Sequence, residues 1–140
     1  MNYFRWILTA LAALVILFST GCGTTSKKEG IEVRTDFQGR GVKVFQISTF
    51  PLYEATLEAL KNMNLKVDDT VELEDAYQVT SKTKDLNIII DIQEVGPKIS
   101  RIRVRAEEGG FFSYSNNEDM ATEIIKETAL VLESKGQFFY

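Results

Sequence analysis

The sequence contains no histidine, one cysteine and only two prolines in 140 residues. Zinc sites, haem sites and Cys–His nucleophiles draw on several histidine or cysteine side chains, so the sequence excludes these classes of site. A single cysteine also excludes an intramolecular disulfide. We therefore expect no metal site and no cofactor.

Positive charge is also scarce. The 16 Lys and Arg residues are outnumbered by 20 Asp and Glu residues, which gives a net charge of −4. A surface that binds DNA or RNA needs a cluster of cations facing the phosphates, so this balance argues against a nucleic-acid partner. The length of the chain corresponds to a single domain.

Signatures of catalysis are few. Without histidine a general base would have to be Asp, Glu or Lys, and the Gly-x-Ser-x-Gly motif of serine hydrolases does not occur. The adjacent pairs Ser81-Lys82 and Ser134-Lys135 lie at the ends of predicted segments. We name no catalytic residue and predict that the chain is not an enzyme.

The N-terminal segment has the pattern of a secretory signal. Arg5 is followed by a thirteen-residue run, residues 6–18, in which every side chain except Thr9 is apolar. A helix of this length spans roughly 20 Å, which is short of the roughly 30 Å hydrocarbon core of a bilayer. The run therefore fits the hydrophobic region of a signal peptide better than a permanent transmembrane helix.

Small side chains lead from this run directly to the only cysteine, in the order Ser19, Thr20, Gly21 and Cys22. The pattern resembles the lipobox of bacterial lipoproteins. This resemblance implies that residues 1–21 are a signal peptide cleaved between Gly21 and Cys22, and that Cys22 carries diacylglycerol and a further acyl chain such as palmitate. The alternative is an uncleaved anchor helix with an incidental cysteine.

Residues 22–41 are interpreted as the acylated cysteine and a flexible tether, because residues 23–30 are small and polar without apolar periodicity. Gly23 follows the cysteine at a place where Asp retains lipoproteins at the inner membrane of enteric bacteria. By that resemblance we expect attachment to the outer membrane, with the domain facing the periplasm. The acyl chains would bind the membrane stably.

Residues 42–133 are predicted to form an α+β domain. Strands are expected at 42–47, 65–73, 77–83 and 86–95, and a helix opening at Thr49 and Pro51 runs to about residue 63. A second helix is expected at 117–133, with Asn116 or Asn117 as its cap. The predicted order is β-α-β-β-β-α, an antiparallel sheet with two helices packed on one face in a two-layer sandwich.

Residues 99–106 alternate cleanly between two faces of a strand. Ile102, Val104 and Ala106 are expected to point inward and Arg101, Arg103 and Arg105 outward. The arginine stripe has the chemistry to bind phosphates, lipid headgroups or an acidic partner. Alternatively, it is a solvated face whose arginines pair across strands with Asp91, Glu94 or Glu72.

Aromatic residues collect near the C-terminus. Phe111, Phe112 and Tyr114 lie in a predicted loop at 109–117, and residues 134–140 form an aromatic tail. These side chains are either buried against the domain or contact a partner or the membrane.

The stretch Lys98-Ile99-Ser100-Arg101-Ile102-Arg103-Val104-Arg105, then Gly109-Gly110 and an acidic amphipathic helix, resembles a family of short bacterial periplasmic lipoproteins of unknown function. The similarity covers residues 42–132 and the lipobox. Helix-grip-like domains of outer-membrane assembly lipoproteins are a more distant likeness. The resemblance implies a fold and an envelope location, and it carries over no catalytic residue.

Two functions remain open from the sequence. The first is a lipid-anchored, non-enzymatic module that binds another envelope protein through the outer sheet face or the aromatic loop, or has a structural role. The second is a carrier or sensor that encloses a small apolar ligand between helix and sheet. A pocket between the first helix and the sheet would favour the carrier.

Overall fold

The computed structural model describes residues 31–109 and 114–137. Its strands are β1 (Arg34–Thr35), β2 (Gly41–Phe45), β3 (Val67–Leu73), β4 (Ala76–Lys82), β5 (Leu86–Gly96), β6 (Ile99–Gly109) and β7 (Tyr114–Asn116). The helices are α2 (Thr49–Asn62) and α3 (Glu118–Ser134). The predicted signal peptide, Gly21 and Cys22 lie outside the described residues.

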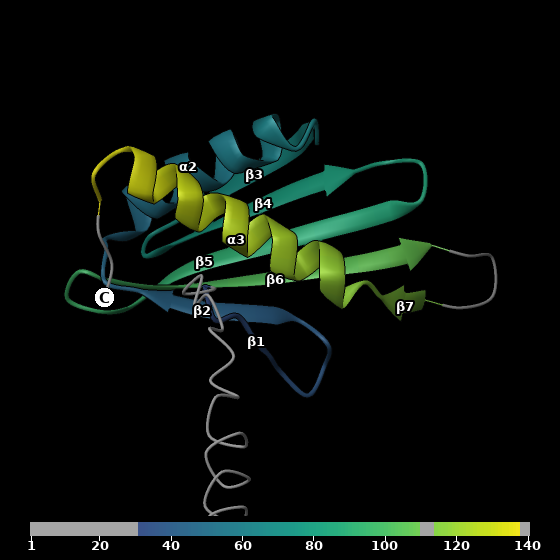
Figure 1. Ribbon diagram of the computed structural model, residues 1–140, viewed down its shortest axis with the longest axis horizontal. Coiled ribbons are helices and arrows are strands. Elements are labelled where there is room, and N and C mark those ends of the chain that lie inside the picture. Colours follow the sequence, from purple (N-terminus) through teal and green to yellow (C-terminus); the bar gives the residue numbers. More distant parts are fainter. Residues whose placement is uncertain (1–30, 110–113, 138–140) are drawn as a thin grey trace, which may run out of the picture. The chain divides into compact units, whose positions relative to one another are not determined.

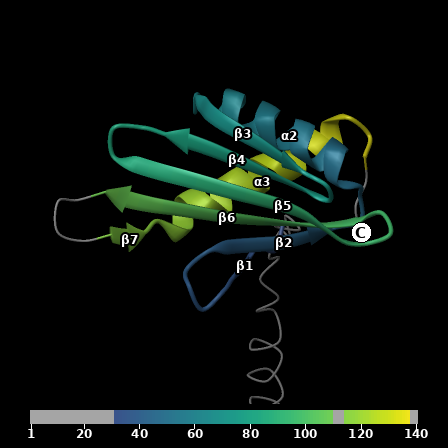
Figure 2. The same cartoon turned by 180° about the vertical axis from the view of Figure 1, so that it is seen from behind.

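All strand pairs are antiparallel, in the order β1-β2-β6-β5-β4-β3, and β7 pairs with β6. Figure 1 shows α2 and α3 lying across one face of this sheet, and Figure 2 shows the opposite face without a covering helix. The predicted α+β sandwich with two helices on one face of an antiparallel sheet is confirmed.

The predicted order of strands is incomplete. The predicted order β-α-β-β-β-α counts three strands between the helices, although the predicted ranges include a fourth strand at 99–106. The structure has all four, β3 to β6, and the described residues add the short strands β1 and β7. β6 is long enough to pair with two shorter strands along its side opposite β5. Its first half pairs with β2 and its last residues pair with β7.

The predicted tether is too long at its C-terminal end. The folded unit begins at residue 31 rather than 42, because Ile31 and Val33 pack against the core and Arg34 pairs with Val42. The apolar side chains of Ile31 and Val33 gain from burial, and the β1–β2 turn then brings the chain back into the sheet. Residues 31–41 thus belong to the domain.

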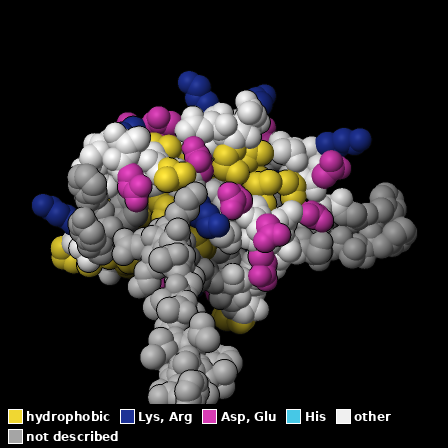
Figure 3. All heavy atoms as spheres, viewed as in Figure 1, with side chains coloured by type: hydrophobic (Ala, Val, Ile, Leu, Met, Phe, Trp, Pro, Cys, Tyr) yellow, Lys and Arg dark blue, Asp and Glu magenta, His cyan; other side chains and the backbone are white. Residues whose placement is uncertain are grey.

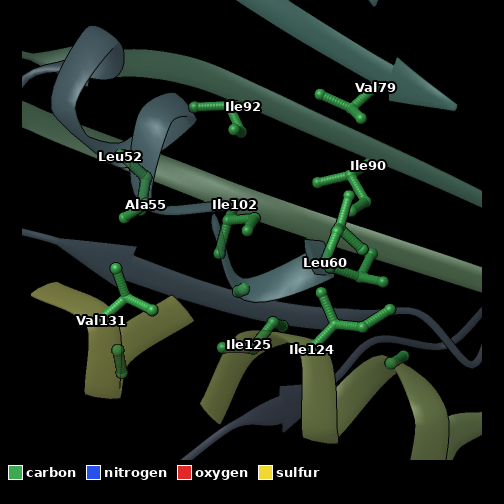
Figure 4. Close-up of a cluster of buried hydrophobic side chains, with 14 of the residues drawn as sticks. Leu52, Ala55, Leu60, Val79, Ile90, Ile92, Ile102, Ile124, Ile125 and Val131 are labelled. Carbon is green, nitrogen blue, oxygen red and sulfur yellow. The ribbon is translucent and has the colours of Figure 1, made fainter. Parts of the chain in front are cut away.

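Period-two alternation places the core between the helices and the sheet. Ile88, Ile90, Ile92, Ile102 and Val104 are fully buried on the helix side. They meet buried residues of both helices, among them Leu52, Ala55, Leu60, Ile124 and Ile125 (Figure 4). The predicted inward face of residues 99–106 is confirmed.

The helix ends follow from local hydrogen bonding. The Asn117 side chain accepts a hydrogen bond from the Met120 amide at 2.8 Å, and it therefore caps α3 as expected. At α2 the capping position is Ser48, one residue before the predicted Thr49, and its side chain makes no capping hydrogen bond. Pro51 lies in the first turn, where its missing N–H costs nothing.

One glycine allows α3 to approach the sheet closely. A Cβ atom added at Gly41 would lie 3.0 Å from Cδ1 of Ile125 and 3.3 Å from Cβ of Ala121. The absence of a side chain at Gly41 therefore lets α3 pack directly onto the start of β2.

Candidate functional site: the outer sheet face and the β1–β2 turn

The face of the sheet opposite the helices carries the predicted arginine stripe. Arg101, Arg103 and Arg105 alternate with the buried residues of β6 and are half-buried themselves. Strand register sets their neighbours: Arg103 lies between Val42 of β2 and Asp91 of β5, and Arg101 lies between Val44 and Gln93. Residues directly opposite in an antiparallel pair share a face, so this surface alternates cations with aliphatic and polar side chains.

The arginines do not form the cross-strand ion pairs considered above. Arg101 donates to the neutral Gln93 side chain at 2.9 Å, and Arg105 lies 3.6 Å from Glu107 of its own strand. Within the described part of the chain Arg103 has neither an ion pair nor a hydrogen-bond partner, and its Nε atom is buried.

The carboxylate nearest to Arg103 in the register is already engaged. Asp91 Oδ1 accepts a hydrogen bond from the Gln78 side chain at 2.8 Å. Glu72, a second candidate partner, accepts from the Tyr77 hydroxyl at 3.3 Å. The stripe is thus a cationic surface whose positive charge is only partly compensated by local carboxylates.

Aliphatic side chains border the stripe. Val44 is 53% exposed; it lies next to Arg101 on the part of β2 that does not pair with β1. A surface groove runs along the same strand and is lined by Glu32, Arg34, Val42, Lys43 and Val44. The outer face therefore combines cations with exposed apolar area, the two features from which protein interfaces draw affinity and orientation.

The predicted aromatic loop is shorter than expected. Residues 114–116 form β7, and Gly109 of β6 pairs with Tyr114. Phe111 and Phe112 lie outside the described residues. The predicted tail begins inside a helix, because α3 continues to Ser134, and residues 138–140 are likewise outside the described part.

The turn between β1 and β2 presents an exposed aromatic residue that the sequence interpretation missed. Phe37 is 93% exposed at the tip of residues 36–40. Phe37 falls within residues 22–41, which the sequence predicts to be the acylated cysteine and a flexible tether. A signal was present: Asp36 and Gly39 occupy the first and last positions of a four-residue turn, where these residue types are preferred.

This turn is braced by hydrogen bonds. One carboxylate oxygen of Asp36 accepts from the amides of Gln38 and Arg40 at 2.9 and 3.1 Å, and the other accepts from the Arg40 guanidinium at 2.7 Å. Gly39 has a φ of +70°, a conformation that other residues rarely adopt. The side-chain amide of Asn116 in β7 donates to the carbonyl of Gln38, which ties the turn to the sheet.

These contacts shift the ionisation of Asp36. Desolvation raises the pKa of this carboxyl, but the hydrogen bonds and charge of Arg40, together with the Gln38 amide, outweigh it and hold the pKa below its ordinary value of 3.8. A lowered pKa in the folded state means that the ionised carboxylate stabilises the fold. This contribution is complete above the pKa of the unfolded chain and is lost as the pH falls through the folded-state pKa.

We expect Asp36→Asn to lower the free energy of unfolding by roughly 1–2 kcal/mol at pH 7, because it weakens charge-assisted hydrogen bonds. The difference from the unsubstituted protein should shrink as the pH falls below about 4. Urea unfolding at pH 7 and at pH 3 measures both effects. Asp68→Asn, at an exposed position of β3, is the control and should change stability by less than about 0.5 kcal/mol. An equal cost for Asp36→Asn at both pH values would contradict the role assigned to its charge.

Polar side chains in the core serve the structure. The four buried ones among the described residues, Thr56, Ser81, Ser100 and Thr128, each donate to a backbone carbonyl at 2.7–2.8 Å. Ser81 and Lys84 have the Ser-x-x-Lys spacing of some serine enzymes, yet the Ser81 hydroxyl is engaged with the carbonyl of Lys66.

The described residues contain no group of three or more His, Cys, Asp or Glu side chains arranged to hold a metal ion. Within the same residues, neither helix has the length and apolarity required to cross a membrane. Comparison of the chain with models of known protein families and with curated proteins finds no match.

Proposed function

We propose that this chain is a lipid-anchored, non-enzymatic envelope module whose outer sheet face binds an acidic surface of another envelope protein. The lipobox pattern around Cys22 supports the anchor, and Gly23 supports an outer-membrane location facing the periplasm. The observation that carries the interaction role is the arginine stripe, in which Arg101 and Arg103 have no carboxylate partner within the described residues.

Charge is distributed unevenly over the domain, which favours an acidic partner. α3 contains five acidic residues and one lysine, and acidic side chains cluster over the middle of the helix side (Figure 3). The outer face presents three arginines on β6, with Asp91 of β5 opposite Arg103 and Glu107 beside Arg105. An acidic partner surface would be attracted to the outer face and repelled from the helix layer, which sets the orientation of binding.

The packing between helices and sheet favours an interaction module over the alternative of a ligand carrier. Leu52, Ala55, Ala59 and Leu60 of α2 are fully buried and pack with the aliphatic residues of β5 and β6 (Figure 4). Two of the surface pockets lie along β2 and at the start of α3, and no residue of α2 lines either of them.

Photo-crosslinking in intact envelopes tests this proposal. A photoreactive residue at Val44, on the outer face, should give a defined protein adduct, whereas one at Leu130, 50% exposed on α3, should not. Adding Arg103→Glu to the Val44 probe should reduce the adduct about tenfold, because reversing a contacting charge costs more than about 1.4 kcal/mol.

Lys126→Glu provides the matched charge reversal, since Lys126 lies on α3 and pairs with Glu123 of the same helix. We expect it to leave the Val44 adduct unchanged. Higher salt should weaken the Val44 adduct, because exposed charges are screened. An adduct that is insensitive to Arg103→Glu, or equally strong from Leu130, would contradict binding through the arginine stripe.

A further inference from the structure

The β1–β2 turn offers a second contact surface beside the outer face, next to the groove along β2 that Arg34 also lines. Phe37, at 93% exposure, is the most exposed of the large apolar side chains in the described residues. Leaving a phenylalanine in water forgoes the free energy of burying it. The turn nevertheless holds Phe37 outward through the hydrogen bonds of Asp36 and the brace from Asn116. A rigid support for an exposed aromatic side chain lowers the entropy lost when that side chain is buried by a partner.

The charges around Phe37 suit a membrane surface. The only acid of the turn, Asp36, is neutralised by the Arg40 guanidinium at 2.7 Å, so the tip carries no uncompensated negative charge. Arg34, three residues before Phe37, has an 85% exposed side chain and only a 3.8 Å contact with Glu32. An apolar tip with a cation behind it matches the bilayer interface, where aromatic rings enter the headgroup layer and cations meet lipid phosphates.

The chain preceding the turn limits how far it lies from a lipid anchor. Eight residues, 23–30, connect Cys22 to the folded unit that starts at Ile31. Fully extended they reach about 30 Å, and as a flexible chain they span roughly 15 Å on average. The strand that follows, β1, leads directly into the turn. Of all the loops in the domain, this turn is the first in the chain after the anchor.

From these observations we infer that the β1–β2 turn is a second membrane contact, in which Phe37 enters the interface of an anionic bilayer and Arg34 faces its phosphates. This inference rests on the proposed lipid anchor at Cys22 and deepens it by assigning the domain an orientation. Full burial of a phenylalanine side chain corresponds to a ~10- to 100-fold preference for an apolar environment over water, which sets the upper limit for the preference of Phe37 for the bilayer.

Tryptophan fluorescence tests this contact. The single tryptophan of the sequence, Trp6, precedes Cys22, so the mature lipidated chain would carry none. Phe37→Trp therefore introduces a unique probe at the tip. Phe50→Trp is the matched control, because Phe50 is 54% exposed at the start of α2, beyond the opposite end of β2 from the turn.

The lipidated variants, purified from membranes, are reconstituted into vesicles of phosphatidylethanolamine and phosphatidylglycerol with brominated or unbrominated acyl chains. Flotation reports anchoring, and the loss of emission in brominated vesicles reports insertion of the probe. We expect both variants to float, and Trp emission to be quenched strongly in Phe37→Trp and little in Phe50→Trp. Thermal unfolding of both variants should match that of the unsubstituted chain.

Flotation without quenching of the Phe37→Trp probe would overturn the inference and leave the lipid anchor standing. It would indicate that Phe37 faces water or a pocket on a protein. Equal quenching of both probes would overturn the assigned orientation. Failure to float would remove the anchor and, with it, the membrane contact of the turn.

Discussion

Replacing Cys22 with alanine is expected to abolish both cleavage and acylation and to leave a full-length precursor. The unsubstituted protein, by contrast, should lack the mass of residues 1–21 and carry the added mass of its acyl chains. The physical reason is that only a thiol forms the thioether to diacylglycerol, and removing the acyl chains removes the stable attachment to the membrane. Intact mass spectrometry of the chain extracted from membranes, for both forms, measures this change.

Ser26→Ala provides the control, since Ser26 lies in the predicted tether and outside the lipobox pattern. This variant should mature normally and remain in the membrane fraction. An unsubstituted chain that is neither cleaved nor acylated would contradict the lipoprotein interpretation. Residues 6–18 would then be the membrane anchor, and the membrane contact assigned to the β1–β2 turn would lose its basis.

Truncating Ile90 to alanine should cost about 2–5 kcal/mol of unfolding free energy, the largest effect on stability that we predict. Ile90 is fully buried at the centre of the sheet and faces the helices (Figure 4). The substitution removes its apolar contacts and leaves a cavity in a close-packed region. For a domain of this size, the midpoint of thermal unfolding should fall by about 10 °C or more.

Ile89→Ala is the matched control, because Ile89 is the preceding residue of β5 and points to the outer face opposite Arg105. Ile89 is only half-buried, so its truncation should cost less than about 1.5 kcal/mol. Circular dichroism during thermal and urea unfolding compares the two variants. Similar losses from both positions would contradict the assignment of the core to the helix side of the sheet.

For the arginine stripe, strand periodicity predicts the face on which the side chains lie but not the partners that they contact. Alternation along a single strand was sufficient to place Arg101, Arg103 and Arg105 on one face. Their partners depended on the register between β6, β5 and β4, which is set by packing and turns. The register places Asp91 opposite Arg103, but the Asp91 carboxylate accepts its hydrogen bond from the side chain of Gln78 on β4.

Short elements were the ones that the sequence analysis missed. β1 has two residues and β7 has three, and so few residues contain no measurable alternation. Both strands exist because longer neighbours, β2 and β6, offer edges to pair with. Missing β1 also meant missing the turn that follows it, and with it the exposed Phe37.

Features set by residues close together in the chain could be predicted from the sequence, and features set by distant contacts could not. The sequence alone determined the two amphipathic helices, the four long strands, the Asn117 cap and the faces of β6, because side-chain periodicity and capping act within a few residues. It also contained the lipobox pattern at Cys22. Only the tertiary structure decided the extra strand pairs, the start of the folded unit at Ile31, the unpaired state of Arg103 and the exposure of Phe37. These depend on contacts between residues far apart in the chain, which local patterns do not encode.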